Sequence, residues 1–162
     1  YDCFARQGEH AFWSRLKKDS LKLSSSLSFG HLNLPADWAE IKKKGPGLNE
    51  ARSTRFGYEA VRVVLYLAWD GNRQALDRFD SAISTFESMG MVPSFVDLAE
   101  DTCSLFAASG GVYAVFARAC QELGRTELSQ KWWKIAGEKV EQEQDDYYSV
   151  VLYLLAGLDI KD

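Results

Sequence analysis

Three stretches of the chain are apolar on nearly every side when they are read at helical spacing. They cover residues 57–70, 105–123 and 145–158. A helix that is apolar all round is buried, whereas a surface helix keeps one polar face. Two further stretches, 73–89 and 126–140, place apolar residues at i, i+3 and i+4, which predicts amphipathic helices. Buried helices would therefore alternate with covering helices along the chain.

This alternation predicts an all-α fold of about six helices, the first of which spans residues 7–28. The apolar side of that first helix would carry Phe12, Trp13, Leu16, Leu21, Leu23 and Leu27. An inner ring of buried helices wrapped by an outer ring is an α/α toroid. Tandem helical hairpins of the tetratricopeptide kind would alternate in a similar way, but no repeat of about 34 residues is visible. The toroid is therefore favoured, and no stretch shows the alternation of a strand.

Two connections in this scheme are long, residues 30–56 and 90–104. Connections of that length in a compact domain are usually functional or flexible. The first contains a run of three lysines, Lys42–Lys44, which we expect to lie in a solvated loop. The second surrounds Pro93.

Length and charge limit the classes of function. The 162 residues suffice for one domain, taken as 1–162, and the formal net charge of -4 argues against a nucleic-acid partner. No apolar run reaches the roughly 18–20 residues that span a bilayer, and no secretory signal is visible. Cys3, Cys103 and Cys120 lack the short spacing of zinc ligands, and His10 and His31 lie far apart. We therefore predict three buried thiols, no metal site and no cofactor.

The candidate chemistry lies at the start of the predicted helix 57–70. Glu59 would fall in its first turn, where the helix dipole favours a charged carboxylate, and Arg62 would follow on the same side. Tyr58 offers a hydroxyl beside them. An ionised carboxylate at the mouth of a buried helix suits a general base that activates water. The same pattern also fits an ion pair that only fixes the helix end, and both interpretations stay open.

Aromatic residues make up 13% of the chain, which suits a large core or a surface that stacks on sugar rings. Trp38, Tyr147 and Tyr148 are candidates for stacking, although each could equally pack in the core. Adjacent aromatic residues on a helix point about 100° apart, so Tyr147 and Tyr148 cannot both face the same core. The same holds for Trp132 and Trp133.

Four segments resemble glycoside hydrolase family 8, most closely its bacterial endoglucanases, and they occur in the family's order. The segments are LPADW at 34–38, RFGYEAVRV at 55–63, LYLAW at 65–69 and DYYS at 146–149. The resemblance runs through residues about 4–158 and matches only the C-terminal half of the family's catalytic domain. It implies part of an (α/α)6 barrel that hydrolyses β-1,4-glucans with inversion at the anomeric carbon.

By position in that motif, Glu59 takes the place of the general base, which is usually an Asp in the family. The resemblance implies that Tyr58 holds the water or the base and that Arg62 pairs with the carboxylate. It assigns four residues to the β-glucan substrate: Arg55, Trp38, Tyr147 and Tyr148. It also implies a periplasmic or secreted protein.

The family's general acid, a Glu, lies in an N-terminal half that this sequence does not match. We therefore expect no complete catalytic pair in the chain and expect a missing N-terminal half as its partner. Such a half toroid would expose apolar helices along two edges. Two other functions remain open, a non-catalytic helical protein that binds glucan or acts as a scaffold, and a degenerate hydrolase that binds glucan without cutting it.

Overall fold

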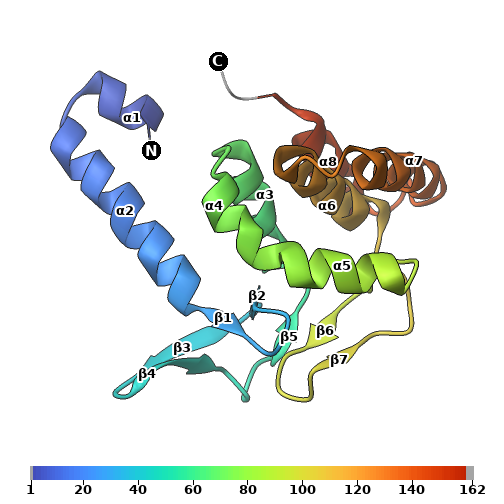
Figure 1. Cartoon of the computed structure of the whole chain (residues 1–162), viewed down its shortest axis with the longest axis horizontal. Helices are drawn as coiled ribbons and strands as arrows, with labels where there is room; N and C mark the ends of the chain where they lie inside the picture. The colour runs from blue at the N-terminus through green and yellow to red at the C-terminus, as the bar shows by residue number, and fades with distance from the viewer. Residues whose placement is uncertain (1, 160–162) are drawn as a thin grey trace.

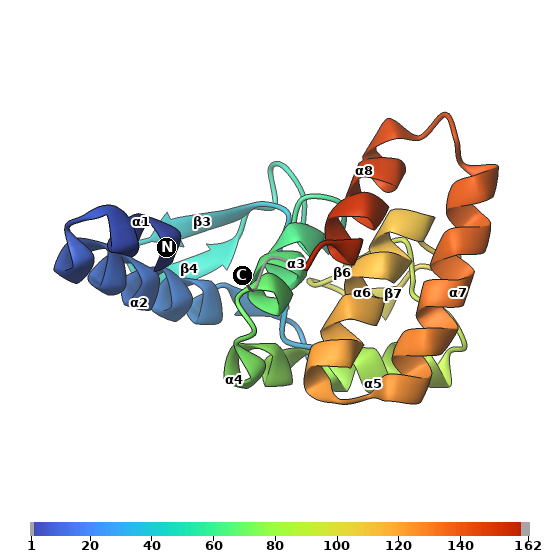
Figure 2. The same ribbon diagram turned by 90° about the horizontal axis from the view of Figure 1, so that it is seen from above.

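The computed structural model describes the backbone of residues 2–159 and the side chains of residues 4–159. Its longer helices are α2 (His10–Ser26), α3 (Val61–Trp69), α5 (Asp80–Ser88), α6 (Gly110–Leu123), α7 (Thr126–Gln142) and α8 (Tyr147–Gly157). The short ones are α1 (Asp2–Gln7), α4 (Arg73–Leu76) and the 3-10 turn η1 (Asp77–Phe79). Figures 1 and 2 show α3, α6, α7 and α8 side by side, with α2 standing apart at the N-terminal end. The mostly helical fold is as predicted.

Helix α6 is the buried centre of this arrangement. Every residue from Gly110 to Cys120 is buried, and the helix packs against α3, α7 and α8. The predicted buried helix at 105–123 is therefore confirmed over most of its length. It begins later than predicted, because Leu105 and Phe106 precede α6 and are 88% and 78% exposed.

Two glycines at the start of α6 allow the neighbouring helices to approach closely. A β-carbon at Gly110 would lie 2.7 Å from the backbone oxygen of Ala136 in α7. At Gly111 it would lie 2.8 Å from Cβ of Leu152 in α8, and closer still to the backbone oxygen of Ser149. Backbone atoms cannot swing aside as a flexible side chain does, so these positions require glycine.

We expect Gly111→Ala to lower the free energy of unfolding by about 1–3 kcal/mol, because the added methyl group overpacks the α6–α8 contact. Gly137→Ala in α7 is the matched control, since its β-carbon would meet only the hydroxyl of Tyr153, at 3.7 Å. That change should stabilise the protein by about 0.5–1 kcal/mol through helix propensity. Urea unfolding followed by circular dichroism measures the free energy of unfolding of both variants. If both substitutions changed it in the same direction and by a similar amount, the packing argument would be contradicted.

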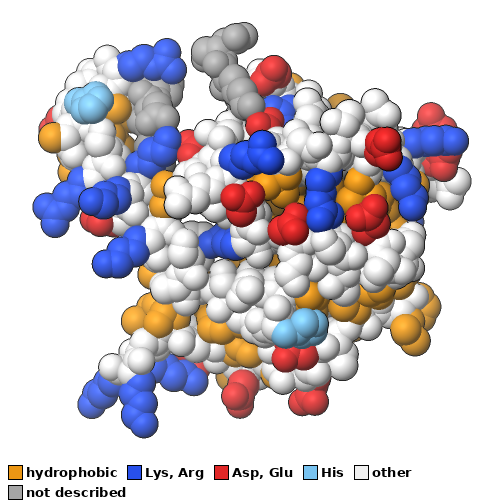
Figure 3. All heavy atoms as spheres, in the orientation of Figure 1, with side chains coloured by type: hydrophobic (Ala, Val, Ile, Leu, Met, Phe, Trp, Pro, Cys, Tyr) orange, Lys and Arg blue, Asp and Glu red, His pale blue; other side chains and the backbone are white. Residues whose placement is uncertain are grey.

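The prediction that the chain has no strands is wrong. Two antiparallel hairpins lie in the first long connection and just before it, β1 (Ser28–Phe29) with β2 (Leu34–Pro35), and β3 (Ala39–Lys42) with β4 (Gly45–Leu48). A third sheet, in the order β5-β6-β7, joins β5 (Arg55–Phe56), β6 (Val96–Asp97) and β7 (Thr102–Cys103). The lysine run lies at the tip of the β3–β4 hairpin, where Figure 3 shows a basic cluster. Paired backbone thus occupies about half of the first long connection and short parts of the second.

Two helices bury less than their apolar composition predicts. Helix α2 has no buried residue, and its Phe12, Leu16 and Leu23 are exposed. Helix α8, predicted to be buried on every side, buries only Ser149, Leu152 and Ala156. Apolar groups are also visible between the charged side chains on the face in Figure 3. Burial is thus concentrated at α6 and falls off toward α2 and the outer side of α8.

Of the two thiols whose side chains are described, Cys120 is buried as predicted and Cys103 is only partly buried. Cys120 is buried in α6, and burial raises the pKa of its thiol to about 12. Burial also raises the pKa of the half-buried Cys103. The side chain of Cys3 lies outside the described residues. Within the described part of the chain, no helix is long and apolar enough to cross a bilayer.

Candidate active site

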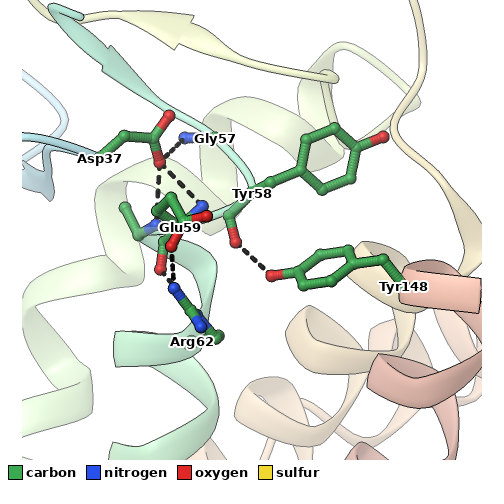
Figure 4. A network of polar contacts seen from close by, with 7 residues as sticks. Asp37, Gly57, Tyr58, Glu59, Arg62 and Tyr148 are labelled. Carbon is green, nitrogen blue, oxygen red and sulfur yellow. Dashed lines mark hydrogen bonds and ion pairs between the residues drawn. The ribbon is translucent and has the colours of Figure 1, made fainter. Parts of the chain in front are cut away.

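The turn at residues 57–60 joins strand β5 to helix α3 and carries the predicted catalytic residues. Helix α3 begins at Val61, so the expectation that Glu59 belongs to its first turn is wrong. The side chain of Glu59 is 53% exposed and forms an ion pair with the guanidinium of Arg62. Arg62 Nε also donates to the backbone oxygen of Glu59, at 3.3 Å. Arg62 therefore contacts both the carboxylate and the backbone of Glu59 (Figure 4).

Helix α8 reaches the same turn through an aromatic pair. The hydroxyl of Tyr148 donates to the backbone oxygen of Tyr58, and the two rings meet edge to face with centroids 5.4 Å apart. Burial raises the pKa of Tyr148, so its phenol stays a neutral donor at physiological pH. Asp146 fixes the start of α8, because its Oδ1 accepts from the backbone N–H of Ser149 at 3.0 Å. Residues 90 positions apart are thereby brought together.

A third segment contacts the turn through Asp37. Its Oδ1 accepts the backbone N–H groups of Gly57, Glu59 and Ala60, at 3.0, 3.1 and 2.8 Å. Figure 4 shows this carboxylate above the turn, with Glu59 and Arg62 on the side of α3. The sequence assigned no role to Asp37, because nothing in local spacing links it to a turn 20 residues away. A weak signal was present, since Asp37 and Gly57 both lie within the family-like segments.

The other predicted substrate residues are not all gathered at this turn. Tyr147 is 80% exposed at the start of α8. The ring of Trp38 is 44% exposed and lies 4.2 Å beneath the guanidinium of Arg52. Arg55 lies in β5 with its guanidinium 4.0 Å above the ring of Phe95. The structure thus brings four of the predicted residues together at the turn: Tyr58, Glu59, Arg62 and Tyr148. Trp38 and Arg55 instead form separate cation–π contacts with other residues.

The chemistry of this site is that of an exposed carboxylate held by an arginine. Such a group can accept a proton from water and can hydrogen-bond to hydroxyl groups. Two partly exposed aromatic rings, Tyr58 and Tyr148, meet at the same turn and offer surfaces that suit flat, apolar ligand faces. Among residues 4–159 there is no group of three His, Cys, Asp or Glu side chains that could hold a metal ion.

Comparison with known sequences places these residues in a family. The family model for glycosyl hydrolases family 8 matches residues 1–160. The chain is 30% identical over 148 residues to a probable endoglucanase of Novacetimonas hansenii. That alignment covers 88% of this chain and 40% of the relative, so the chain spans well under half of the relative's length.

Solved structures show the same fold. An endoglucanase from Klebsiella pneumoniae, described as a family 8 glycosyl hydrolase, matches with a TM-score of 0.71 and 22% identity over 94% of this chain and 46% of that one. An endoglucanase from Komagataeibacter sucrofermentans matches with a TM-score of 0.67 and 29% identity over 90% of this chain and 43% of that one. The prediction that the helices form part of an (α/α)6 toroid is confirmed.

Proposed function

The chain belongs to glycosyl hydrolases family 8, and on that premise we propose that it forms the general-base side of an endo-β-1,4-glucanase active site. Glu59 would take a proton from a water molecule as the water oxygen bonds to the anomeric carbon of the glucan. The glycosidic C–O bond breaks, and the departing oxygen takes a proton from a carboxylic acid outside this chain. The configuration at the anomeric carbon is thereby inverted.

The observation that carries this proposal is the exposure of the Glu59–Arg62 pair together with the contacts that hold its turn. An exposed ion pair contributes only about 0–1 kcal/mol to stability, so fixing a helix end is a weak reason for this arrangement. The side chain of Glu59 stays accessible to water, while α8 holds the turn through Tyr148. A fixed backbone with an accessible carboxylate is what a general base requires.

The base position is held by Glu where the family usually has Asp, so the carboxylate extends one methylene farther from the turn. Inverting glycosidases keep their two carboxyl groups about 6.5–9.5 Å apart to leave room for a water molecule. The carboxylate of Glu59 pairs with Arg62, which lies at the start of α3. We propose that this contact compensates for the added reach.

We propose that the rest of the domain supplies the general acid and covers the exposed apolar faces of α2 and α8. This agrees with a chain that spans about 40% of the relative from Novacetimonas hansenii. Tyr147, Trp38 and Arg55 would bind the glucan on either side of Glu59, by ring stacking and hydrogen bonding. Export to the periplasm or beyond would bring the enzyme to its polymeric substrate.

The test is hydrolysis of carboxymethylcellulose and cellohexaose by the longest natural protein that contains this chain. We expect new reducing ends, with the α-anomer of the product appearing first in proton NMR spectra. Residues 1–162 alone should release none. Quenching of Tyr and Trp fluorescence by cello-oligosaccharides without product would show a protein that binds glucan but does not cut it. The absence of both signals would indicate a scaffold.

A further inference from the structure

We propose that Asp37 is a positioning residue of this active site, which fixes the place of the Glu59 carboxylate by holding the backbone turn beneath it. The inference rests on the proposed function, because it assigns Asp37 a part in the same reaction. Asp37 does not touch the reacting atoms in this role. It acts through the turn at residues 57–60 and through Glu59.

The first support is that one carboxylate oxygen gathers three backbone N–H groups. Oδ1 of Asp37 accepts from Gly57, Glu59 and Ala60 at 2.8–3.1 Å. These donors precede α3, where backbone N–H groups have no helical partner. A carboxylate there is favoured both by the hydrogen bonds and by the positive end of the helix dipole. Asp37 therefore performs the function of a helix cap from a distant part of the chain.

The second support comes from the other carboxylate oxygen. A β-carbon at Gly57 would lie 2.7 Å from Oδ2 of Asp37. One oxygen thus accepts the N–H groups, and the other occupies the space that a side chain at position 57 would need. The backbone N–H of Asp37 also donates to the oxygen of Arg55, at 2.7 Å. Asp37 is consequently hydrogen-bonded both to Arg55, before the turn, and to the backbone of the turn itself.

The arrangement also explains why α3 lacks a local cap. Helices α4 and α8 are capped by residues adjacent to them, Asn72 and Asp146. The residue at the cap position of α3 is Ala60, which has no side-chain hydrogen bond to offer. The preceding positions are occupied by Tyr58 and Glu59. Because Asp37 supplies the cap from elsewhere, the side chain of Glu59 is left to pair with Arg62 and to face water.

The expected effect of losing Asp37 is on turnover rather than on glucan binding. A catalytic group misplaced by about 1 Å can cost on the order of 10²-fold in rate. Asp37→Asn keeps the shape of the side chain but removes the charge that draws three N–H groups to one oxygen. We expect kcat on carboxymethylcellulose to fall roughly 10- to 100-fold, with KM within about twofold of the parent value.

The experiment uses the longest natural protein that contains this chain, with Asp37→Asn and Asp37→Ala beside Asn72→Ala. The control removes the cap of α4, where Asn72 Oδ1 accepts from Ala75 N–H at 3.1 Å. It should lower the melting temperature by an amount similar to Asp37→Ala and leave kcat per folded molecule unchanged. If Asp37→Asn and Asp37→Ala also lower only the melting temperature, Asp37 is a structural cap and the proposal is overturned.

Gly57→Ala tests the same contact from the opposite side. Alone it should lower kcat, since the methyl group pushes the Asp37 carboxylate out of place. In an Asp37→Ala background the space is free, and adding Gly57→Ala should change kcat by less than about twofold. Independent, multiplicative losses in the double variant would overturn the coupling of these two residues.

A measurement without substrate separates this inference from the proposed function. Amide hydrogen exchange at Glu59 and Ala60, followed by NMR, should accelerate at least about tenfold in Asp37→Asn, while amides of α6 stay unchanged. A parent protein that cuts no β-glucan overturns the proposed function, and this exchange then decides whether Asp37 holds the turn. Unchanged exchange at both residues overturns the inference whatever the parent protein cuts.

Discussion

Replacing Glu59 with Gln is expected to lower kcat on β-glucan by about 10²–10⁴-fold, which is the contribution that a general base makes to a hydrolytic step. The amide has nearly the same shape as the carboxylate but cannot take a proton from water. KM should change little, because the aromatic residues that we propose to bind the glucan are untouched. The measurement is the release of reducing ends by the longest natural protein and its Glu59→Gln variant.

The fold should tolerate this change. Glu59 is largely exposed, and its ion pair with Arg62 contributes only about 0–1 kcal/mol to stability. Glu138→Gln is the matched control, because Glu138 is an exposed helical carboxylate whose nearest cation is Lys134, at 3.9 Å. It should keep full activity. Equal activity of the Glu59→Gln variant and the parent would remove Glu59 from the role of base.

Added azide distinguishes a missing base from a damaged site. In Glu59→Ala a small anion has room where the carboxylate stood, and azide needs no base to become nucleophilic. Its nitrogen would bond to the anomeric carbon as the glycosidic C–O bond breaks, giving an α-glycosyl azide. We expect azide to restore turnover in Glu59→Ala and to leave the parent unaffected. A variant that azide does not rescue would indicate that the site itself has changed shape.

The helices were predictable because their signal is dense and periodic. Ala114, Val115 and Phe116 of α6 lie in a run with scarcely a polar residue, which predicts burial, and all three are buried. The ends of the helices are marked by glycine, as at Gly124, whose φ of 81° suits few other residues. Helix α8 carries the same apolar signal but is half exposed. An apolar composition predicts that a helix face packs against other residues. It does not show whether those residues belong to the same chain.

The strands were not predictable because they are short, with two to four residues each. Strands β3 and β4 have four residues each and none of these is buried, so no face alternates between polar and apolar. Their pairing depends on backbone hydrogen bonds and on a tight turn at Lys43 and Lys44. Neither leaves a hydrophobic period in the sequence. The sequence therefore predicted that the connection at residues 30–56 is long, but it did not predict the conformation of that connection.

The candidate site also contains contacts that the sequence predicts and contacts that it does not. The pairing of Glu59 with Arg62 follows from a spacing of three residues, so the sequence predicted it correctly. The contacts of Tyr148 and Asp37 with the turn join residues 90 and about 20 positions apart, and no local period encodes them. Local spacing therefore identified the charged pair, whereas the groups that hold its backbone emerged only from the tertiary structure.

Phe116→Ala is expected to have the largest effect on stability, lowering the free energy of unfolding by about 3–5 kcal/mol. The Phe116 ring meets Phe56 of β5, Phe86 of α5 and Trp132 of α7 edge to face, with centroids 6.0, 5.4 and 6.2 Å apart. One side chain thus joins three elements around α6. Its removal leaves a cavity that three rigid rings cannot fill by changing rotamer, and each aromatic pair itself contributes about 0.5–1.5 kcal/mol.

Thermal unfolding measures the loss. In a domain of this size 1 kcal/mol shifts Tm by about 2–4 °C, so the expected fall is about 6–20 °C. Phe106→Ala removes the same atoms from a ring that is 78% exposed, and it should alter stability by no more than about 0.5 kcal/mol. If both variants unfold at the parent temperature, the Phe116 cluster is not the centre of the core. Phe116→Ala should also reduce activity in proportion to the unfolded fraction, without altering KM, because Glu59 lies in the turn that follows β5 and does not contact the Phe116 ring in the folded protein.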